Sequence, residues 1–330
     1  MAKNKINNLK QPWGLGLIFG VLYAVIGYYI FFLIDDNDRF LFLLSNSFLW
    51  GIPLGLSALV AFLAPLESRG DLKYGVWQSA LAVLMFFGIV LLLTFGVLIC
   101  FVVFLPIMVM GAMIGGILFS SVVKFIDNRK TFMSMILIPV LIAPYLTAAI
   151  ETRSTPPTSI RTVHSSVVIE TTADIVWENI IEVREITPEE QPFSWLQLLG
   201  IPRPVEASMD GTGLNATRFG HFSNGLVFTE NITDWQPGVK INFDILTSDL
   251  GDLPSPIDQI GGRYFQVMDA TYKIEPMADG NIRLHLSSTH RLTTHVNGYI
   301  SWWTDLIMED FQDYLLEIIK VRVENVWVQG

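Results

Sequence analysis

The sequence predicts an all-α transmembrane bundle of about five helices, followed by an α+β domain in which a curved antiparallel sheet wraps on a long C-terminal helix. The chain of 330 residues is 51% hydrophobic and only 16% charged, which is too apolar for a soluble protein of this length. Residues 1–159 carry ten basic and seven acidic side chains, whereas residues 160–330 carry eleven and twenty-four. Such asymmetry indicates two domains in different surroundings, and the acidic half argues against nucleic acid as a partner.

Long uncharged runs in residues 1–150 predict the membrane helices. A helix needs about 20 apolar residues to cross a bilayer core of roughly 30 Å. Because the third run has 47 residues, we expect it to form two helices, with a bend between Thr94 and Pro106. Five crossings follow from the runs 13–34, 40–66, 77–123 and 131–150.

The positions of lysine and arginine orient these helices, because cytoplasmic loops are enriched in both residues. Basic residues precede the first helix and follow the second and the fourth. Five crossings from a cytoplasmic N-terminus place the C-terminal domain outside the cytoplasm, in the periplasm if the cell is Gram-negative. If residues 77–123 cross only once, that domain is cytoplasmic. The basic residues are Lys3, Lys5, Lys10, Arg69, Lys73, Lys124, Arg129 and Lys130.

Small residues are spaced for close helix packing in two places, Gly51-x-x-x-Gly55 and Gly111-x-x-x-Gly115. They fit either ordinary packing inside one bundle or a homo-oligomer interface. The predicted spans contain no Asp, Glu, Lys, Arg or His. This counts against an autonomous pump, which normally needs an ionisable residue at membrane depth.

The second half begins with a polar linker at residues 151–162, stiffened by Pro156 and Pro157, and continues as a domain over 163–330. Thr172 is a candidate cap for the next helix, and Thr187-Pro188-Glu189-Glu190 predicts the start of another that ends before Gly200. One apolar face on residues 299–323 predicts the closing helix. The expected elements are strand 163–170, helices 172–183 and 188–199, strands near 204–209, 214–222, 226–234, 239–246, 263–274 and 281–292, and helix 299–323.

An antiparallel sheet with one apolar face must be covered, and the last helix is the only element long enough to do this. Three segments resemble the START-like superfamily, also called SRPBCC, over about residues 162–326. They are "VVIETTADIVWENI", "TRFGHFSNGLVFTENITDWQPG" and "YISWWTDLIMEDFQDYLLEIIKVRVE". The resemblance implies a helix-grip fold with a ligand cavity between sheet and helix. It implies no particular chemistry, because the superfamily includes both carriers and enzymes.

The hairpin at residues 217–234 places two charged residues among apolar neighbours. If Ser223-Asn224-Gly225 forms a three-residue turn, Arg218 lies directly opposite Glu230. Glu230 shares a face with Leu226 and Phe228, so the pair is expected on the apolar side. It either orients the polar end of a ligand or serves as a structural ion pair.

The alternating faces of the later strands supply the other candidates for a ligand site. Most of these residues are expected to fill the core, and the polar members are the better candidates. His290 also fits a histidine satisfied by a neighbouring hydroxyl group. The complete predicted ligand site is Arg218, Glu230, Phe243, Tyr264, Met268, Tyr272, Leu286 and His290.

Familiar catalytic motifs are absent: there is no G-x-S-x-G, no phosphate-binding loop and no C-x-x-C. A metal site is not expected, because a five-residue spacing puts His285 and His290 on opposite faces of a strand. No cofactor is predicted either. The Gly/Pro-rich loop 247–262 fits a pocket rim or a solvated loop.

Three functions fit these features. The first is a multi-pass cell-membrane protein whose helix-grip domain binds or transfers a hydrophobic small molecule or lipid beside the bilayer. The second is an enzyme of the cyclase or dehydratase type, with Tyr264, Tyr272, His290 or Glu230 as acid–base groups. The third is a sensor or assembly protein whose cavity-free domain binds a protein partner in the membrane. The first is favoured over the enzyme, and the sequence identifies no catalytic residue.

Overall fold

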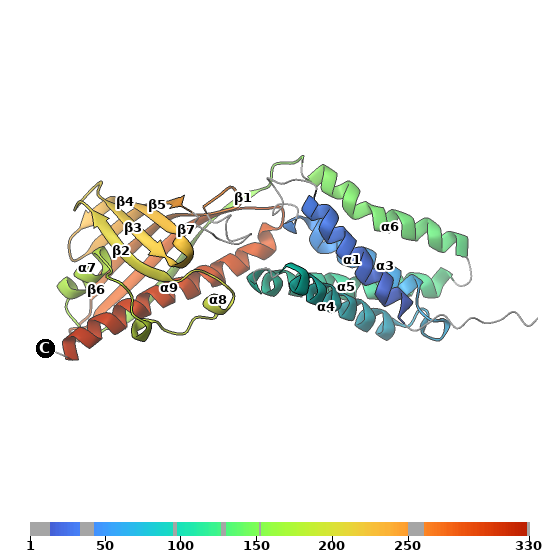
Figure 1. Ribbon diagram of the computed structural model, residues 1–330, viewed down its shortest axis with the longest axis horizontal. Coiled ribbons are helices and arrows are strands. Elements are labelled where there is room, and N and C mark those ends of the chain that lie inside the picture. The colour runs from blue at the N-terminus through green and yellow to red at the C-terminus, as the bar shows by residue number, and fades with distance from the viewer. Residues whose placement is uncertain are drawn as a thin grey trace, which may run out of the picture. The chain divides into compact units, whose positions relative to one another are not determined.

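The computed structural model describes residues 14–33, 43–94, 98–126, 130–151, 153–249 and 261–328. The chain divides into a helical unit and a unit that contains the sheet, with the main boundary between Thr155 and Pro156. Figure 1 labels the elements of both units. The helical unit contains α1 (Leu15–Leu33), η1 (Ser47–Gly51), α3 (Ile52–Phe62), η2 (Leu66–Ser68), α4 (Leu72–Thr94), α5 (Leu98–Ile126) and α6 (Lys130–Glu151).

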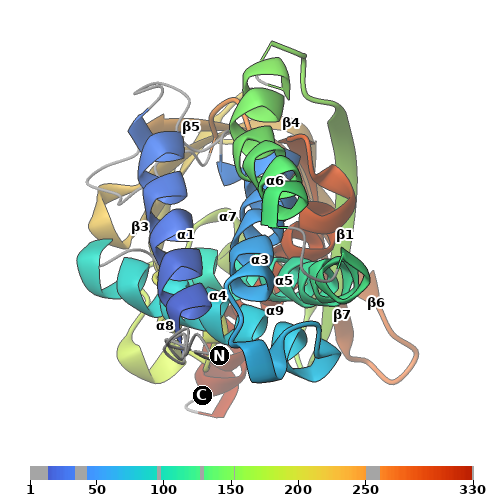
Figure 2. The ribbon, with the colours of Figure 1, turned by 90° about the vertical axis from the view of Figure 1, so that its right-hand side faces the viewer.

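Helix α3 lies in the middle of the helical unit, between α1 and α6, and nearly all of its side chains are buried (Figure 2). Gly55 of α3 leaves room for a large neighbour, because a Cβ there would come within 2.6 Å of the Tyr23 ring. A Cβ at Gly115 of α5 would likewise meet Ser57 of α3 at 2.8 Å. The predicted small-residue pairs therefore pack inside this bundle, which accounts for them without a second copy of the chain.

Three helices of the described residues are long and apolar enough to cross a membrane, over Leu72–Leu93, Phe101–Ile126 and Ser134–Glu151. Leu15–Phe31 and Ser47–Phe62 are apolar but shorter. The uncharged run 77–123 does form two helices, α4 and α5. α4 ends at Thr94 and α5 begins at Leu98, so the break between them falls in the predicted interval from Thr94 to Pro106, and Pro106 itself lies inside α5. Much of the orientation argument concerns residues outside the described ranges, including Lys3, Lys5 and Lys10.

The predicted linker 151–162 is shorter in the structure. Glu151 is the last residue of α6, and its carboxylate accepts hydrogen bonds from the backbone N–H groups of Asn46 (2.8 Å) and Ser47 (3.0 Å) at the start of η1. The first strand begins at Thr158, because residues 158–162 pair with β7. This pairing joins segments more than a hundred residues apart, so no local pattern revealed it.

Seven antiparallel strands form one sheet in the order β1-β7-β6-β5-β4-β3-β2. Strands β2 to β7 follow one another as a meander, and the last of them, β7, pairs with β1. Figure 1 shows the sheet curving around the long helix α9. The strands are β1 (Thr158–Ile169), β2 (Pro204–Asp210), β3 (Thr217–Phe222), β4 (Val227–Gln236), β5 (Lys240–Asp249), β6 (Phe265–Pro276) and β7 (Ile282–Thr293).

The connection between β1 and β2 carries α7 (Ala173–Ile181), η3 (Pro188–Glu190) and α8 (Trp195–Leu198). The single helix predicted over 188–199 is wrong: the chain makes two short helical turns separated by residues 191–194. Glu190 closes the first turn by accepting the Thr187 N–H at 2.8 Å, and its carboxylate is also held by Arg322 of α9 at 2.6 Å. The short turn Pro188–Glu190 is thus held by a contact with the closing helix, whereas the local pattern predicted a longer helix.

Helix α9 (Asn297–Val328) covers the concave face of the sheet, as the apolar stripe predicted. This domain is an antiparallel sheet closed by a long C-terminal helix, the arrangement of a helix-grip fold. Its main core lies toward the C-terminal end of α9, where the helix meets α7 and the sheet. The fully buried residues there include Ile169, Val176, Ile180, Ile232, Ile241, Phe243, Leu284, Leu316 and Val323.

Candidate functional site

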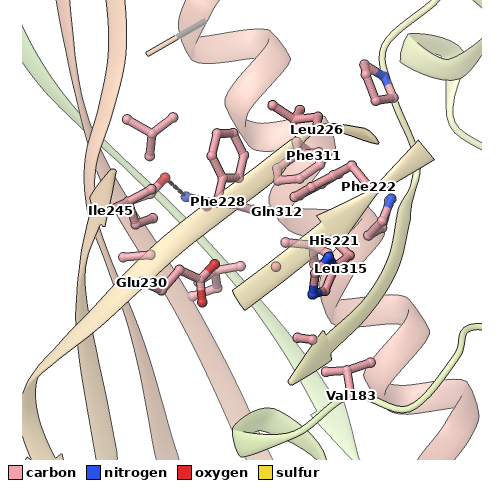
Figure 3. Close-up of a pocket in the computed structure, with 18 of the residues that line it drawn as sticks. Val183, His221, Phe222, Leu226, Phe228, Glu230, Ile245, Phe311, Gln312 and Leu315 are labelled. Atoms are coloured by element: carbon pink, nitrogen blue, oxygen red, sulfur yellow. Dashed lines mark hydrogen bonds between the residues drawn. The ribbon is translucent and has the colours of Figure 1, made fainter. Parts of the chain in front are cut away.

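A cavity of about 170 Å³ lies between the sheet and α9. Figure 3 shows side chains from the strands, from α9 and from the segment before β2 facing it. Its walls are mainly apolar. The residues that contribute most of the wall are Val183, Ile186, Leu196, Ile201, Pro202, Pro204, Ala207, Phe222, Leu226, Phe228, Phe243, Ile245, Phe265, Val267, Ala270, Leu286, Ile307, Met308, Phe311, Leu315, Ile318 and Ile319.

The segment around α8 forms one side of the cavity and is tied down at both ends. Ser194 donates a hydrogen bond to Asp310 of α9 at 2.7 Å. Arg203 and Ser223 are joined by two hydrogen bonds, from the Arg203 N–H to Ser223 Oγ (2.9 Å) and from the Ser223 N–H to the Arg203 carbonyl (2.7 Å). The segment therefore connects the closing helix to the β3–β4 turn. Sequence reasoning missed it, because it read the segment as a plain helix.

Arg218 and Glu230 form an ion pair on the wall of this cavity. The hairpin has the predicted register: the two residues are direct partners on β3 and β4, and the Phe222 N–H donates to the Leu226 carbonyl at 2.9 Å across the turn. Their side chains are only 8% and 12% exposed. The position fits both predicted roles of the pair. It can stabilise the hairpin as a structural ion pair, and it lies within reach of the polar end of a ligand.

Arg218 has two further contacts that hold its guanidinium in place. Its Nε donates to the carbonyl of Ile181 at 3.0 Å. Its Cζ lies 5.3 Å from the centre of the Phe243 ring, close enough for a cation–π interaction. The arginine is thus fixed by a carboxylate, a carbonyl and an aromatic face.

Tyr272 of β6 lines the same part of the cavity. Burial raises the pKa of Tyr272 to about 12, while the charge of Arg218 lowers this pKa and that of Glu230 raises it. The hydroxyl therefore lies within the electrostatic reach of the ion pair and stays protonated at neutral pH. Its ring meets Phe243 edge-on at 6.2 Å.

A second polar spot lies where α9 crosses the sheet. Gln312 is 1% exposed, and its amide nitrogen donates to the Val163 carbonyl (3.1 Å) and to Ser288 Oγ (2.6 Å). Ser288 and Gln312 both line the cavity. The sequence did not identify Gln312, although one signal existed: it is a polar residue within the apolar stripe of α9, between Met308 and Leu315.

Two of the predicted ligand residues, Tyr264 just before β6 and Met268 on β6, do not line the cavity, and a β-bulge explains the difference. The register shifts between Val267 and Asp269, so the extra residue Met268 is 37% exposed and does not line the cavity. Phe265 and Val267 face the cavity before the bulge, and Ala270 and Tyr272 face it afterwards. Tyr264 precedes β6; it is buried, but away from the cavity.

His290 also lies outside the cavity, completely buried near the start of α9. Its Nε2 is 3.3 Å from Thr304 Oγ1 and 3.7 Å from Asp305 Oδ1, and its ring lies against Phe265. Burial lowers the pKa of His290, whereas Asp305 raises it and Arg161 lowers it again. The structure therefore matches the alternative given for His290, a buried histidine whose ring nitrogen is satisfied by a neighbouring hydroxyl group.

The predicted site thus divides into two groups. Arg218, Glu230, Phe243, Tyr272 and Leu286 line one cavity, while the other three predicted residues do not. Across the described ranges, no group of three or more His, Cys, Asp or Glu side chains is placed to hold a metal ion. Most of the loop 247–262, predicted as a rim or a solvated loop, lies outside the described residues.

No protein-family model matches the chain, and no curated protein matches its sequence. Solved structures similar to it include a START superfamily protein from Mycobacterium smegmatis, at 11% identity and a TM-score of 0.34, covering 50% of this chain and 98% of that one. Truncated norcoclaurine synthase from Thalictrum flavum has 12% identity and a TM-score of 0.31, with 50% and 94% covered. Major latex-like protein 151 from Panax ginseng has 10% identity and a TM-score of 0.31, with 50% and 97% covered. Because all three TM-scores are below 0.5, the helix-grip architecture rests on the strand order and closing helix described above.

Proposed function

We propose that this protein is a membrane-anchored module that binds or transfers a hydrophobic small molecule or lipid in the cavity under α9. The observation that carries the proposal is the cavity itself, which is lined mainly by apolar side chains with a few polar groups on its wall. Concave, mostly apolar sites with a few placed polar groups are typical of small-molecule binding. A solid core would instead have favoured the sensor or assembly role.

Membrane anchoring is proposed from the surface of the helical unit. Large apolar side chains point outward there, including Leu92 (76% exposed), Phe125 (92%) and Ile150 (70%). Many exposed apolar side chains of this size on one helical unit are unfavourable in water and favourable in lipid. With α4, α5 and α6 as spans and α1 and α3 as shorter candidates, the five-crossing arrangement and an extracytoplasmic cavity domain remain our proposal.

The binding role is tested by filling the cavity. Ala270 lies on its wall, opposite Phe243 on β5 and Ser288 on β7, so Ala270→Phe adds a ring to the open space. Lys273→Phe is the matched control, because it adds the same ring to an exposed position of the same strand. The full chain in nanodiscs is titrated with 2-naphthol, a small, fluorescent and uncharged probe; partition into empty nanodiscs is subtracted, and the melting temperature is recorded.

We expect Ala270→Phe to abolish probe binding with little change in melting temperature, because an open cavity tolerates added volume better than a packed core does. The Lys273→Phe control should bind like the wild type. Failure of the wild type to bind any apolar probe, together with a large loss of stability in Ala270→Phe, would show that the cavity closes in solution and would overturn the binding role.

A second candidate is an enzyme, because titratable groups that include Glu230 and Tyr272 line a mainly apolar cavity. Tyr272 would serve as a proton donor, since its hydroxyl is protonated at neutral pH and lies in the same cavity as Glu230. Mass spectrometry of molecules that co-purify with the wild type and with Tyr272→Phe distinguishes the two roles. A carrier yields the same compound from both proteins, whereas an enzyme yields product from one and unreacted substrate from the other.

A further inference from the structure

We call the part of the cavity wall formed by Arg218, Glu230 and Tyr272 its polar end, and the ion pair there is neutral overall before any ligand enters. Arg218 is engaged by Glu230 and by the Ile181 carbonyl, so its positive charge is compensated within the protein. An anionic ligand would be attracted by Arg218 and repelled by Glu230 at similar distances. The cost of removing the anion from water would therefore remain largely uncompensated.

Hydrogen-bonding groups nevertheless remain at this end of the cavity. Arg218 engages Oε2 of Glu230, and among the described residues neither Oε1 of Glu230 nor the Tyr272 hydroxyl has a hydrogen-bond partner. Gly220 keeps the carboxylate accessible, because a Cβ at that position would come within 3.2 Å of Oε1. One free acceptor and one free hydroxyl thus face the same space.

The size of the cavity restricts the ligand further. Its volume is about 170 Å³. An apolar cavity of about 150 Å³ accommodates one benzene molecule. The walls also offer aromatic partners, including Phe222, Phe228 and Phe243. These dimensions fit a molecule of one or two rings and exclude a lipid with two long acyl chains.

We propose that the cavity selects a neutral apolar molecule of one or two rings that carries a hydroxyl group, in preference to the corresponding carboxylate. This inference rests on the proposed binding function and specifies its ligand. The ligand hydroxyl donates to Glu230 Oε1 and accepts from the Tyr272 hydroxyl, while the rings contact the aromatic walls. Hydrogen bonds to charged groups favour the hydroxyl compound by about tenfold or more over the unsubstituted hydrocarbon.

The test compares three compounds with one ring system: 2-naphthol, naphthalene and 2-naphthoate. Binding to the full chain in nanodiscs is measured by equilibrium dialysis at neutral pH, and partition into empty nanodiscs of the same lipid is subtracted. We expect 2-naphthol to bind at least tenfold more tightly than either of the other two.

Three variants test which residues cause the preference for 2-naphthol. Glu230→Gln leaves Arg218 uncompensated, so 2-naphthoate should gain at least tenfold relative to 2-naphthol. Tyr272→Phe and Gly220→Ala change no charge; they should weaken 2-naphthol about tenfold and leave naphthalene binding unchanged. Tyr314→Phe is the matched control: it removes a buried tyrosine hydroxyl of α9 that is not on the cavity wall, so the order of the three compounds should not change.

The two proposals fail in different ways. If none of the three compounds binds the wild type above the empty-disc background, the binding function itself is wrong, and this inference fails with it. If the compounds bind but 2-naphthoate or naphthalene equals 2-naphthol, only the ligand preference is wrong. Should Glu230→Gln fail to fold, Tyr272→Phe still decides the question, because unchanged 2-naphthol binding there would refute the proposed contact.

Discussion

Breaking the ion pair between Arg218 and Glu230 should destabilise the cavity domain far more than replacing both partners. Removing one partner of a buried pair costs about 3–5 kcal/mol, because the other charge stays buried and unpaired. The pair qualifies as buried, with side chains 8% and 12% exposed. Arg218→Met also leaves the Ile181 carbonyl without the donor that now lies 3.0 Å away, which adds about 1 kcal/mol.

The two single variants should lose different amounts of unfolding free energy. Arg218→Met should lose about 4–6 kcal/mol by the two terms above. Glu230→Leu should lose somewhat less, near 3 kcal/mol, because Arg218 keeps both the Ile181 carbonyl and the Phe243 ring at 5.3 Å. The double variant leaves no unpaired charge, so it should lose only about 1–2 kcal/mol. The coupling free energy should therefore be at least about 3 kcal/mol.

Hydrogen–deuterium exchange of the full chain in nanodiscs measures these differences, because the slowest amides of β4 and β5 report the free energy of opening of the sheet. A loss of about 3 kcal/mol should accelerate their exchange by about two orders of magnitude. If a single variant unfolds outright, recovery of slow exchange in the double variant is the corresponding result. Strictly additive losses would refute the reasoning, because they would mean that the two charges do not depend on each other.

Two further predictions concern topology and pH. A reporter fused after Gly330 should show active alkaline phosphatase and dark green fluorescent protein if the chain crosses five times; the reverse pattern contradicts that topology. Hydrogen bonds from Arg322 hold the pKa of Glu190 below its ordinary value of 4.5. The stability from this contact is therefore present above pH 4.5 and disappears as the pH falls through the lowered pKa. Arg322→Gln should remove this part of the acid destabilisation, and equal pH dependence of the two unfolding free energies would disprove the assignment.

The sequence alone determined the features that depend on composition or on local geometry. Uncharged runs identified the helical unit, because runs of about 20 or more apolar residues are typical of long apolar helices. The hairpin register was readable as well, because a three-residue turn with Gly225 in the left-handed conformation was expected, and the structure has both Asn224 and Gly225 in that conformation. Once the turn is fixed, Arg218 must lie opposite Glu230.

Tertiary structure alone decided which of the alternating residues reach the cavity. The bulge after Val267 turns Met268 away and keeps Tyr272 inside, and a period of two gives no sign of where an extra residue is inserted. The pairing of Thr158 with Thr293 and the contact of Glu190 with Arg322 join distant segments, which local patterns do not encode. The cavity exists because two apolar surfaces approach without filling the space between them, and periodicity shows which face is apolar but not how closely two faces meet.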